Sequence, residues 1–487
     1  MLNDYLTSKD INFNLYSTYI IKEYIETNQE NKNYAALELL LSQISKEELI
    51  ILTSLLNKDD KRLSYTTLYI LINISALKDA EKLFYLDENI CCNIASFSGN
   101  NKKDDILLKY GIMLIRNLTV DKNICEIFNK YKITEFYEEI YERHLLDNKI
   151  MDYLTYSICS IIGFEAKKQE NKKNASILLP CIRIIATQLR PNYEPSRLHR
   201  YIYRLYELSD FKNPEIYFQI INSKIHKELM DIYPKLSEKC DISQKKLDEL
   251  NSSKNLFTQE QIAKLKDDNE YYYYACLLIL KILGKLMGKD DGILLQTLLN
   301  ADISSFLKPL ILTNDLRTIK NVSFCFSNIC SGTYGQVGYL FNNNALYELI
   351  KVGKNIYEAM ELSKEKDDYY FQLKDTLREI NYVFALTITN SIFEKSVPFA
   401  KCYDYTPIKI LVKSLKIYCD VNNQEFLCTI VRGLVKLIYF NNFFEENICD
   451  VMEKFGFKEN LEYILQNENW EIFEDFERIY DSIFGFI

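Results

Sequence analysis

The sequence predicts an all-α protein, a right-handed α-solenoid in which short helices stack as repeats. Turn-forming residues are scarce, with 13 Gly and 8 Pro among 487 residues, against an average usage of about 7% and 5%. A β-sandwich or β-barrel needs many tight turns, so this composition argues against both. Apolar residues recur every three to four positions along the whole chain, and no run of alternating polarity predicts a strand. A hydrophobic content of 48% is ample for a large core.

The helical pattern is clearest in several apolar segments, taken here in chain order. They are residues 37–56 with a polar SKEE turn at 45–48, then 65–75, 106–119, 151–163, 274–288, 380–393 and 426–440. The segment 65–75 is apolar on nearly every side, which predicts a helix packed between two neighbours. The sequence PNYEPSRLHRY at 191–201 contains two prolines, which predicts a break between helices.

Several of these segments end on a similar phrase, which indicates an internal repeat. Asn73 is followed by Ile-Ser, Asn117 by Leu-Thr, Asn328 by Ile-Cys and Asn390 by Ser-Ile. Asn73 and Asn117 are 44 residues apart, within the window of about 40–47 residues of armadillo and HEAT repeats. The 211 residues from Asn117 to Asn328 are close to five such periods, and the 62 from Asn328 to Asn390 are about half a period too many. We therefore expect a single armadillo-like solenoid over residues 1–487, with roughly eight to ten repeats.

Three polar stretches interrupt the pattern and are predicted to be surface loops or insertions. They lie at 165–176, 237–255 and 361–370. The stretch 361–370 accounts for the extra half period between Asn328 and Asn390. The first contains Lys167, Lys168, Lys172 and Lys173, so it also admits interpretation as a nuclear localisation signal.

Charge and motif content narrow the possible functions. A net charge of −9 argues against direct binding of nucleic acid and of anionic membranes, and it permits a basic partner. The 13 cysteines are odd in number and lack metal-ligand spacing, which predicts reduced thiols and no metal or other cofactor. No signal peptide or membrane span is predicted. The three histidines are isolated and no nucleotide-binding motif is present, so we expect no enzymatic activity.

One stretch, SFCFSNICSGTYGQVGYLF at 323–341, places two residues away from the predicted core. On a helical wheel Ile319, Val322, Phe326, Ile329 and Cys330 form one apolar stripe. Phe324 and Asn328, four residues apart, are neighbours on the reverse face. Ser331-Gly332 predicts the helix end, with Gly332 in a left-handed conformation.

Residues 319–350 resemble one armadillo repeat of the importin-α family. The family pattern is Trp-x-x-x-Asn on the third helix, a short turn, and then Gln and an aliphatic pair. Phe324 matches the Trp position, Asn328 the Asn, and Gln336-Val337 the opening of the next repeat. The resemblance implies that Asn328 holds the main chain of an extended peptide and that Phe324 walls a slot for a Lys or Arg side chain. Both roles suit the chemistry of the two side chains.

Weaker matches to the same pattern lie elsewhere in the chain. They are Tyr69 with Asn73, Met113 with Asn117, and Leu386 with Asn390. For all the pairs a second interpretation stays open, in which the asparagine marks a helix end and its neighbour packs on the next repeat. No slot position holds a Trp, and the basic N-terminal arm of the family is missing.

Two functions follow as expectations. The first is an importin-α-like scaffold or adaptor that holds an extended, basic protein segment in a concave groove, with Phe324, Asn328, Tyr69, Asn73, Asn117 and Asn390 as the binding residues. The alternative is a structural subunit of a large cytoskeletal or ciliary assembly with degenerate armadillo repeats. Either function places the protein in the cytoplasm, in the nucleus or on the cytoskeleton.

Overall fold

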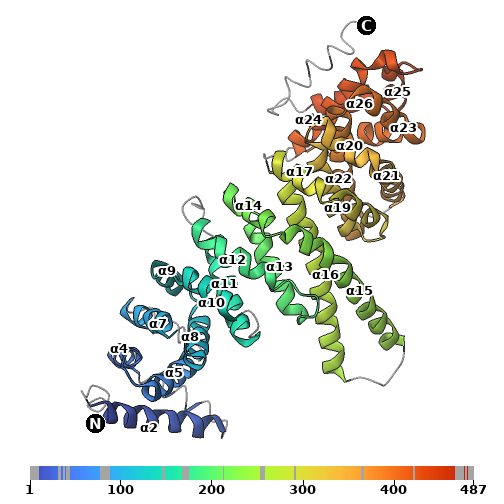
Figure 1. Cartoon of the computed structure of the whole chain (residues 1–487). Coiled ribbons are helices and arrows are strands. Elements are labelled where there is room, and N and C mark those ends of the chain that lie inside the picture. Colours follow the sequence, from blue (N-terminus) through green and yellow to red (C-terminus); the bar gives the residue numbers. More distant parts are fainter. Residues whose placement is uncertain are drawn as a thin grey trace. The chain divides into compact units, whose positions relative to one another are not determined.

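The protein is helical wherever its structure can be described (Figure 1). The computed structural model describes residues 10–30, 35–36, 39, 44–76, 88–101, 103–144, 148–166, 175–211, 213–252, 258–289, 292–363, 367–420, 423–466, 477 and 480. Within these residues every regular element is an α- or 3₁₀-helix. The predicted fold class, an all-α solenoid, is confirmed. The helices divide into two compact units, Met1–Ile225 (unit 1) and His226–Ile487 (unit 2). A single solenoid over residues 1–487 stays a prediction.

Unit 1 consists of one main row of helices with further helices packed against it. In the main row each helix packs on the next in the order α2 (Ile11–Glu30), α5 (Lys61–Ser75), α8 (Asp105–Leu118), α11 (Asn148–Ala166) and α13 (Pro195–Leu208). The other helices are α4 (Lys46–Leu55), α7 (Glu88–Asn100), α9 (Lys122–Lys130), α10 (Ile133–His144), α12 (Ala175–Thr187) and α14 (Pro214–Asn222). Because α5 lies between α2 and α8, the predicted two-sided packing of residues 65–75 is confirmed. The predicted break near residue 191 is also confirmed, since no helix covers residues 188–194.

Unit 2 repeats this arrangement. Its main row is α16 (Gln259–Met287), α19 (Leu316–Cys330), α22 (Asp368–Asn390) and α24 (Gln424–Tyr439). The other elements are α15 (Ile225–Ser252), α17 (Gly292–Asn300), α18 (Ile303–Leu307), η1 (Lys308–Leu312), α20 (Tyr334–Asn342), α21 (Ala345–Leu362), α23 (Phe393–Ile417), η3 (Asn441–Phe443), α25 (Ile448–Lys454) and α26 (Phe457–Leu465). Stacking of this kind buries each helix against the next and gives a repeat protein its core.

Four main-row helices begin at an aspartate that caps their free backbone amides. Asp60, Asp104, Asp315 and Asp367 are the N-caps of α5, α8, α19 and α22, and each carboxylate accepts hydrogen bonds from first-turn amides. A capping aspartate of this kind is worth about 1 kcal/mol of helix stability. The SKEE turn belongs to the same class of signal, because Ser45 and Glu48 form a capping box at the start of α4.

Helix α19 shows how the main row forms the core. The five residues of its predicted apolar stripe are all buried, as expected. Ser323, Cys325 and Ser327 are buried as well, since α16 packs on one side of α19 and α22 on the other. Phe324 and Asn328 are only half-buried, which agrees with their place on the reverse face.

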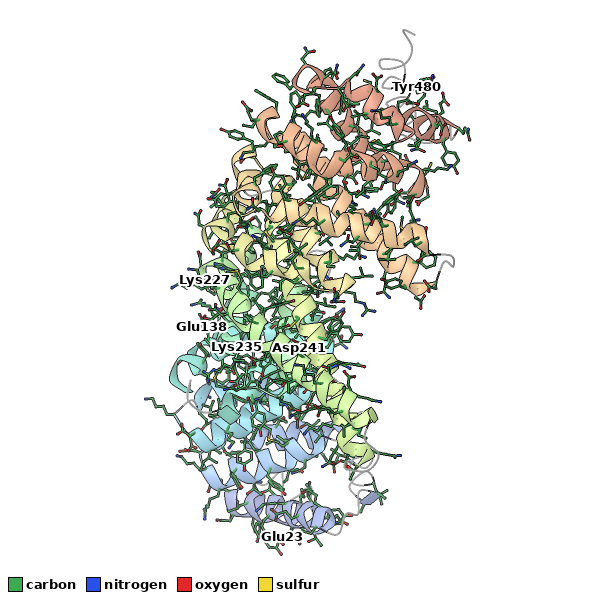
Figure 2. All side chains as sticks on the ribbon, turned by 90° about the vertical axis from the view of Figure 1, so that its right-hand side faces the viewer. Glu23, Glu138, Lys227, Lys235, Asp241 and Tyr480 are labelled. Atoms are coloured by element: carbon green, nitrogen blue, oxygen red, sulfur yellow. The ribbon has the colours of Figure 1, made fainter. Side chains whose placement is uncertain are left out.

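Two expectations about local structure are wrong. Residues 237–252 form no loop: they continue α15, a helix of 28 residues. Its polar face lies in solvent, where Figure 2 labels Lys227, Lys235 and Asp241, all three exposed. An amphipathic helix with one apolar stripe needs few apolar residues, so its polar composition resembles that of a loop. Of the basic stretch 165–176, residues 167–174 lie outside the described residues. Of the stretch 361–370, residues 361–362 belong to α21 and 368–370 to α22, and 364–366 lie outside the described residues, so an insertion there stays a prediction.

The second wrong expectation is the left-handed conformation of Gly332. Helix α19 ends at Cys330 as predicted, but among the described glycines only Gly456 has a positive φ. Gly332 is required for space instead, because a Cβ there would lie 2.3 Å from Oε1 of Gln336 and 3.1 Å from Cδ2 of Leu295. Gln336 occupies this space as the N3 residue of a capping box with Thr333 at the start of α20.

Candidate partner-binding site

Phe324 lies against the preceding main-row helix at a position without a side chain. A Cβ on Gly284 of α16 would come within 2.5 Å of Cδ1 and 2.6 Å of Cε1 of the Phe324 ring. Glycine at 284 therefore admits the ring between α16 and α19. The ring stays half-buried, so one part of it packs on α16 and another part faces solvent.

Asn328 contacts the same helix one turn further on. Its Nδ2 donates a hydrogen bond of 2.9 Å to the backbone carbonyl of Gly284. Gly288, the C-cap of α16, makes room for the amide, because a Cβ there would lie 3.0 Å from Cγ, Nδ2 and Oδ1 of Asn328. The Gly284 carbonyl also accepts the backbone N–H of Gly288 at 3.0 Å, so Asn328 adds a second hydrogen bond to a carbonyl in the last turn of α16.

Asn117 and Asn390 repeat this contact on other main-row helices. Nδ2 of Asn117 donates to Oγ of Ser75 at 3.0 Å and, at 3.4 Å, to the carbonyl of Ile72 near the end of α5. Nδ2 of Asn390 donates to the carbonyl of Cys330, the last residue of α19, at 2.8 Å. We call Asn117, Asn328 and Asn390, together with Lys436 described next, the cap ladder. Through it each repeat is tied to the end of the helix before it.

Lys436 belongs to this ladder although sequence analysis did not single it out. Its Nζ donates to the carbonyls of Thr389 at 2.6 Å and Ser391 at 2.8 Å, at the end of α22. Burial lowers the pKa of this ammonium group. A cation at a helix C-terminus also interacts favourably with the helix dipole. Because a lysine stands here in place of the asparagine, the repeated Asn-containing pattern does not predict this position.

The pair Tyr69 and Asn73 differs from the others. Nδ2 of Asn73 bonds to the carbonyl of Tyr69 in its own helix at 2.8 Å, and its Oδ1 accepts a hydrogen bond of 2.5 Å from Nε2 of Gln29. The Tyr69 hydroxyl donates to Oε1 of Gln29, and Nζ of Lys22 lies 5.6 Å from the ring centroid. Helix α2 thus supplies both an amide and a cation to this pair.

A fixed interval between two residue types marks the repeat in the sequence. The N-cap aspartate precedes the asparagine of the repeated phrase by 13 residues in Asp60/Asn73, Asp104/Asn117 and Asp315/Asn328. In α22 the interval from Asp367 to Asn390 is 23 residues, because that helix has 23 residues against 15 in α19. Aspartate starts and asparagine ends are common separately, and only their fixed interval marks the repeat.

The amides of the cap ladder keep hydrogen-bonding capacity. A side-chain amide has two N–H donors and one acceptor oxygen. Within the described residues, the hydrogen bonds of Asn117, Asn328 and Asn390 all run from Nδ2. These bonds leave the three Oδ1 atoms and one N–H each of Asn328 and Asn390 for a peptide unit, whereas Asn117 uses Nδ2 in two bonds. Helix-end capping by these asparagines is thus an observed role, and peptide binding stays a prediction.

The charges near Phe324 are mixed. Lys320 of α19 forms an ion pair with Asp375 of α22 at 2.9 Å. Burial raises the pKa of Glu379, while Arg378 and Lys320 act to lower it. A carboxylate that is partly withdrawn from water offers a cation a stronger field than an exposed one does.

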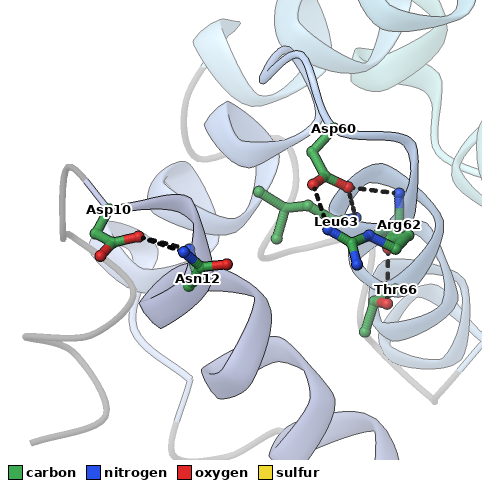
Figure 3. Close-up of polar contacts among 6 residues, drawn as sticks. All are labelled: Asp10, Asn12, Asp60, Arg62, Leu63 and Thr66. Atoms are coloured by element: carbon green, nitrogen blue, oxygen red, sulfur yellow. Dashed lines mark hydrogen bonds and ion pairs between the residues drawn. The ribbon is translucent and has the colours of Figure 1, made fainter.

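Unit 1 contains an apolar cleft of about 740 Å³ at the starts of α5 and α8. Tyr16, Tyr19 and Tyr65 line it, with Ile106 and Leu107. Its cations are paired: Lys61 with Asp104 at 2.7 Å, Arg62 with Asp60 at 3.2 Å and Lys22 with Glu26 at 3.5 Å. Figure 3 shows Asp60 accepting from the amides of Arg62 and Leu63 beside this cleft.

The described part of the chain offers neither a metal site nor a membrane-spanning helix. No group of three or more His, Cys, Asp or Glu side chains there is placed to hold a metal ion. No helix among the described residues combines the length and the apolar character needed to cross a membrane.

Comparison with known proteins bears on the fold. No protein-family model and no curated protein matches the sequence. Among solved structures, an engineered protein is similar over 99% of this chain and 98% of its own, at 13% identity and a TM-score of 0.59. A structure from work on the phosphorylation-controlled interaction between cadherin and β-catenin is similar over 91% of this chain and 70% of its own, at 9% identity and a TM-score of 0.57. A designed armadillo repeat protein in complex with the peptide (KR)4 is similar over 62% of this chain and 99% of its own, at 15% identity and a TM-score of 0.41.

The stacked helices and the cap ladder together define the class of protein. Helices stack in main rows, and two of the ladder bonds join residues 44 and 45 positions apart, the interval of armadillo and HEAT repeats. The fold class is an all-α solenoid of armadillo-like repeats, with a main row of stacked helices in each of the two units.

Proposed function

We propose that the protein is a non-catalytic scaffold that binds an extended segment of a partner protein along the main row of unit 2. The observation that carries this proposal is the pair Phe324 and Asn328. The ring is half-buried, and the Asn328 amide keeps its Oδ1 and one N–H beyond the bond to Gly284. An amide of this kind pairs with the main chain of any sequence.

A basic segment fits this surface best. Residues 226–487 contain 30 Lys and Arg against 38 Asp and Glu, whereas residues 1–225 contain 29 against 30. Most of the net charge of −9 therefore belongs to unit 2. The partly exposed face of Phe324 can take the stem and charge of a Lys or Arg side chain. This is the importin-α-like form of the proposal.

Peptide titration tests it. A fluorescein-labelled Lys/Arg-rich peptide is titrated into the full chain, the Phe324→Ala variant and the control Tyr334→Ala, and anisotropy is measured. Tyr334 is 68% exposed on α20, outside the main row. We expect Phe324→Ala to weaken binding about five- to tenfold and the control to leave it unchanged. Absence of saturable binding, or equal binding by Phe324→Ala, would overturn the adaptor form.

The alternative function, a structural subunit of a cytoskeletal or ciliary assembly, has an observation of its own. The ladder amides already serve contacts within the chain, which suits repeats that stiffen a scaffold. Co-sedimentation of the full chain with polymerised microtubules tests this function. Pelleting that is saturable and unaffected by Phe324→Ala would favour the structural subunit over the adaptor.

A further inference from the structure

Three helices of the unit 1 main row bring two arginines onto one tyrosine ring. The guanidinium carbon of Arg116 (α8) lies 4.5 Å from the ring centroid of Tyr156 (α11), and that of Arg200 (α13) lies 4.9 Å from the same centroid. Arg116 also lies 5.6 Å from the ring of Tyr153. We call Arg116, Tyr156 and Arg200 the Arg–Tyr–Arg cluster.

The two arginines of the cluster have no acidic partner among the described residues. Salt bridges in this part of unit 1 use other cations: Arg197 pairs with Asp152, and Arg204 pairs with Glu207. The nearby carboxylates are thus neutralised by Arg197 and Arg204. Arg200 is exposed and Arg116 is half-buried, so both guanidinium groups can be reached from solvent.

The tyrosine ring prepares the guanidinium groups for a ligand. A guanidinium group stacked on an aromatic ring keeps its N–H donors at the edge of its plane, where they can form paired hydrogen bonds to a carboxylate or phosphate. Stacking also restricts the arginine side chain before binding, which lowers the entropy cost of forming the complex. Arg116 and Arg200 already lie over the ring of Tyr156, so this ring is not available to a Lys or Arg side chain of a partner.

The positive charge of the cluster comes from its two arginines. His199, next to Arg200, has its pKa lowered by burial and by the Arg200 charge, so it adds no positive charge at neutral pH. Residues 1–225 are nearly neutral as a whole, with 29 Lys and Arg against 30 Asp and Glu. The positive charge is therefore local to this row, unlike the broad basic surface that nucleic-acid binding requires.

We propose that the Arg–Tyr–Arg cluster binds an acidic segment of a partner protein through carboxylate or phosphate groups. This site lies in unit 1, carries the opposite charge to the one proposed around Phe324, and does not depend on it. A partner with one acidic and one basic stretch could contact both units, but each site is tested by itself.

Three labelled peptides serve as probes with the full chain. One is a short Asp/Glu-rich peptide, the second carries a phosphoserine at its centre, and the third has every acid replaced by Asn or Gln. We expect saturable binding of the acidic peptides and none of the neutral one. Tighter binding of the second peptide assigns the site to phosphate, and equal binding assigns it to carboxylate.

Single substitutions test whether the acidic peptides bind at the Arg–Tyr–Arg cluster. Arg116→Gln and Arg200→Gln are each expected to weaken binding about tenfold, and Arg116→Lys to weaken it less, since it keeps the charge and loses the planar fork. Arg183→Gln is the matched control, because it removes the same charge from α12 outside the main row, where Arg183 pairs with Glu138. Circular dichroism confirms that each variant is folded, and Phe324→Ala should bind as the native chain does.

The proposal fails if neither acidic peptide binds saturably. It also fails if Arg183→Gln weakens binding as much as Arg200→Gln does, which would indicate diffuse electrostatic attraction. Preferential, Arg116-dependent binding of a single-stranded oligonucleotide over both acidic peptides would replace the protein partner with a nucleic acid.

Discussion

Asn328 and Gly284, 44 residues apart, are joined by a hydrogen bond of 2.9 Å from the asparagine amide to the glycine carbonyl. The same glycine lacks the Cβ that would collide with the ring of Phe324. One position on α16 therefore receives both residues of the predicted pair. The contact couples the helix end of one repeat to the exposed face of the next, and its energetics can be measured.

Gly284→Ala should destabilise unit 2. The added Cβ would lie 2.5 Å from Cδ1 of Phe324 and 3.3 Å from Sγ of Cys325, so the ring must move out of its place. We expect a loss of about 1–3 kcal/mol in the free energy of unfolding, measured by urea denaturation. Gly338→Ala is the control: nothing lies within 4 Å of its Cβ, and alanine favours a helix by up to about 1 kcal/mol. Equal effects of the two substitutions would contradict the close approach at residue 284.

Asn117→Ala should remove two hydrogen bonds of the cap ladder, and Asn390→Ala should remove one. A hydrogen bond of this kind contributes about 0.5–1.5 kcal/mol to stability, and the two sites share no partner, so their effects should add. Chemical denaturation of the two single variants and the double variant measures this. Asn342→Ala, at an exposed position at the end of α20, should change stability little. A double variant no less stable than the native chain would rule out the structural role of the ladder.

Acidification should destabilise the protein through His226. This imidazole is 3% exposed, and burial, with a smaller effect of Lys227, lowers its pKa from 6.5 to about 4. Between those values the unfolded chain binds a proton that the folded chain does not, so the stabilising difference is present above pH 6.5 and is lost as the pH falls toward 4. The expected loss between pH 7 and pH 5 is about 1–2 kcal/mol. It is measured as the difference in pH dependence between the native chain and His226→Gln, and identical pH profiles would be inconsistent with a buried, neutral histidine.

Thiol reactivity should separate two groups of cysteines. None of the 13 cysteines forms a disulfide. Seven are buried and the rest are half-buried; the buried ones are Cys91, Cys125, Cys159, Cys181, Cys276, Cys325 and Cys330. Burial raises the pKa of Cys91 and of Cys159 to about 12, and a protonated thiol is a poor nucleophile. With Ellman's reagent at pH 8 the half-buried thiols should react first and the buried ones only on unfolding in guanidinium. Mass mapping of the labelled sites identifies them, and early labelling of Cys325 would contradict the packing of α19.

Much of the fold could be predicted because helical periodicity is a local property. Residues 323–341 predicted the end of α19, the start of another helix and the apolar stripe centred on Phe326, and all three are confirmed. The local sequence pattern wrongly predicted a loop at residues 237–252, because the amphipathic helix there has the composition of a loop. It also failed at Gly332, where a steric requirement from Gln336 and Leu295 replaced the expected backbone conformation.

The sequence by itself determined most of the helical segments and the apolar side of α19 that faces the core, since these depend on residues within one or two turns. The tertiary structure decided what the remaining side chains contact. Asn390 donates a hydrogen bond to the carbonyl of Cys330. Lys436 of α24 takes the role of an asparagine and donates to carbonyls at the end of α22. Arg116 and Arg200 both lie over the ring of Tyr156. These contacts join residues roughly 40 to 60 positions apart, and the packing of neighbouring repeats, which no local pattern encodes, brings them together.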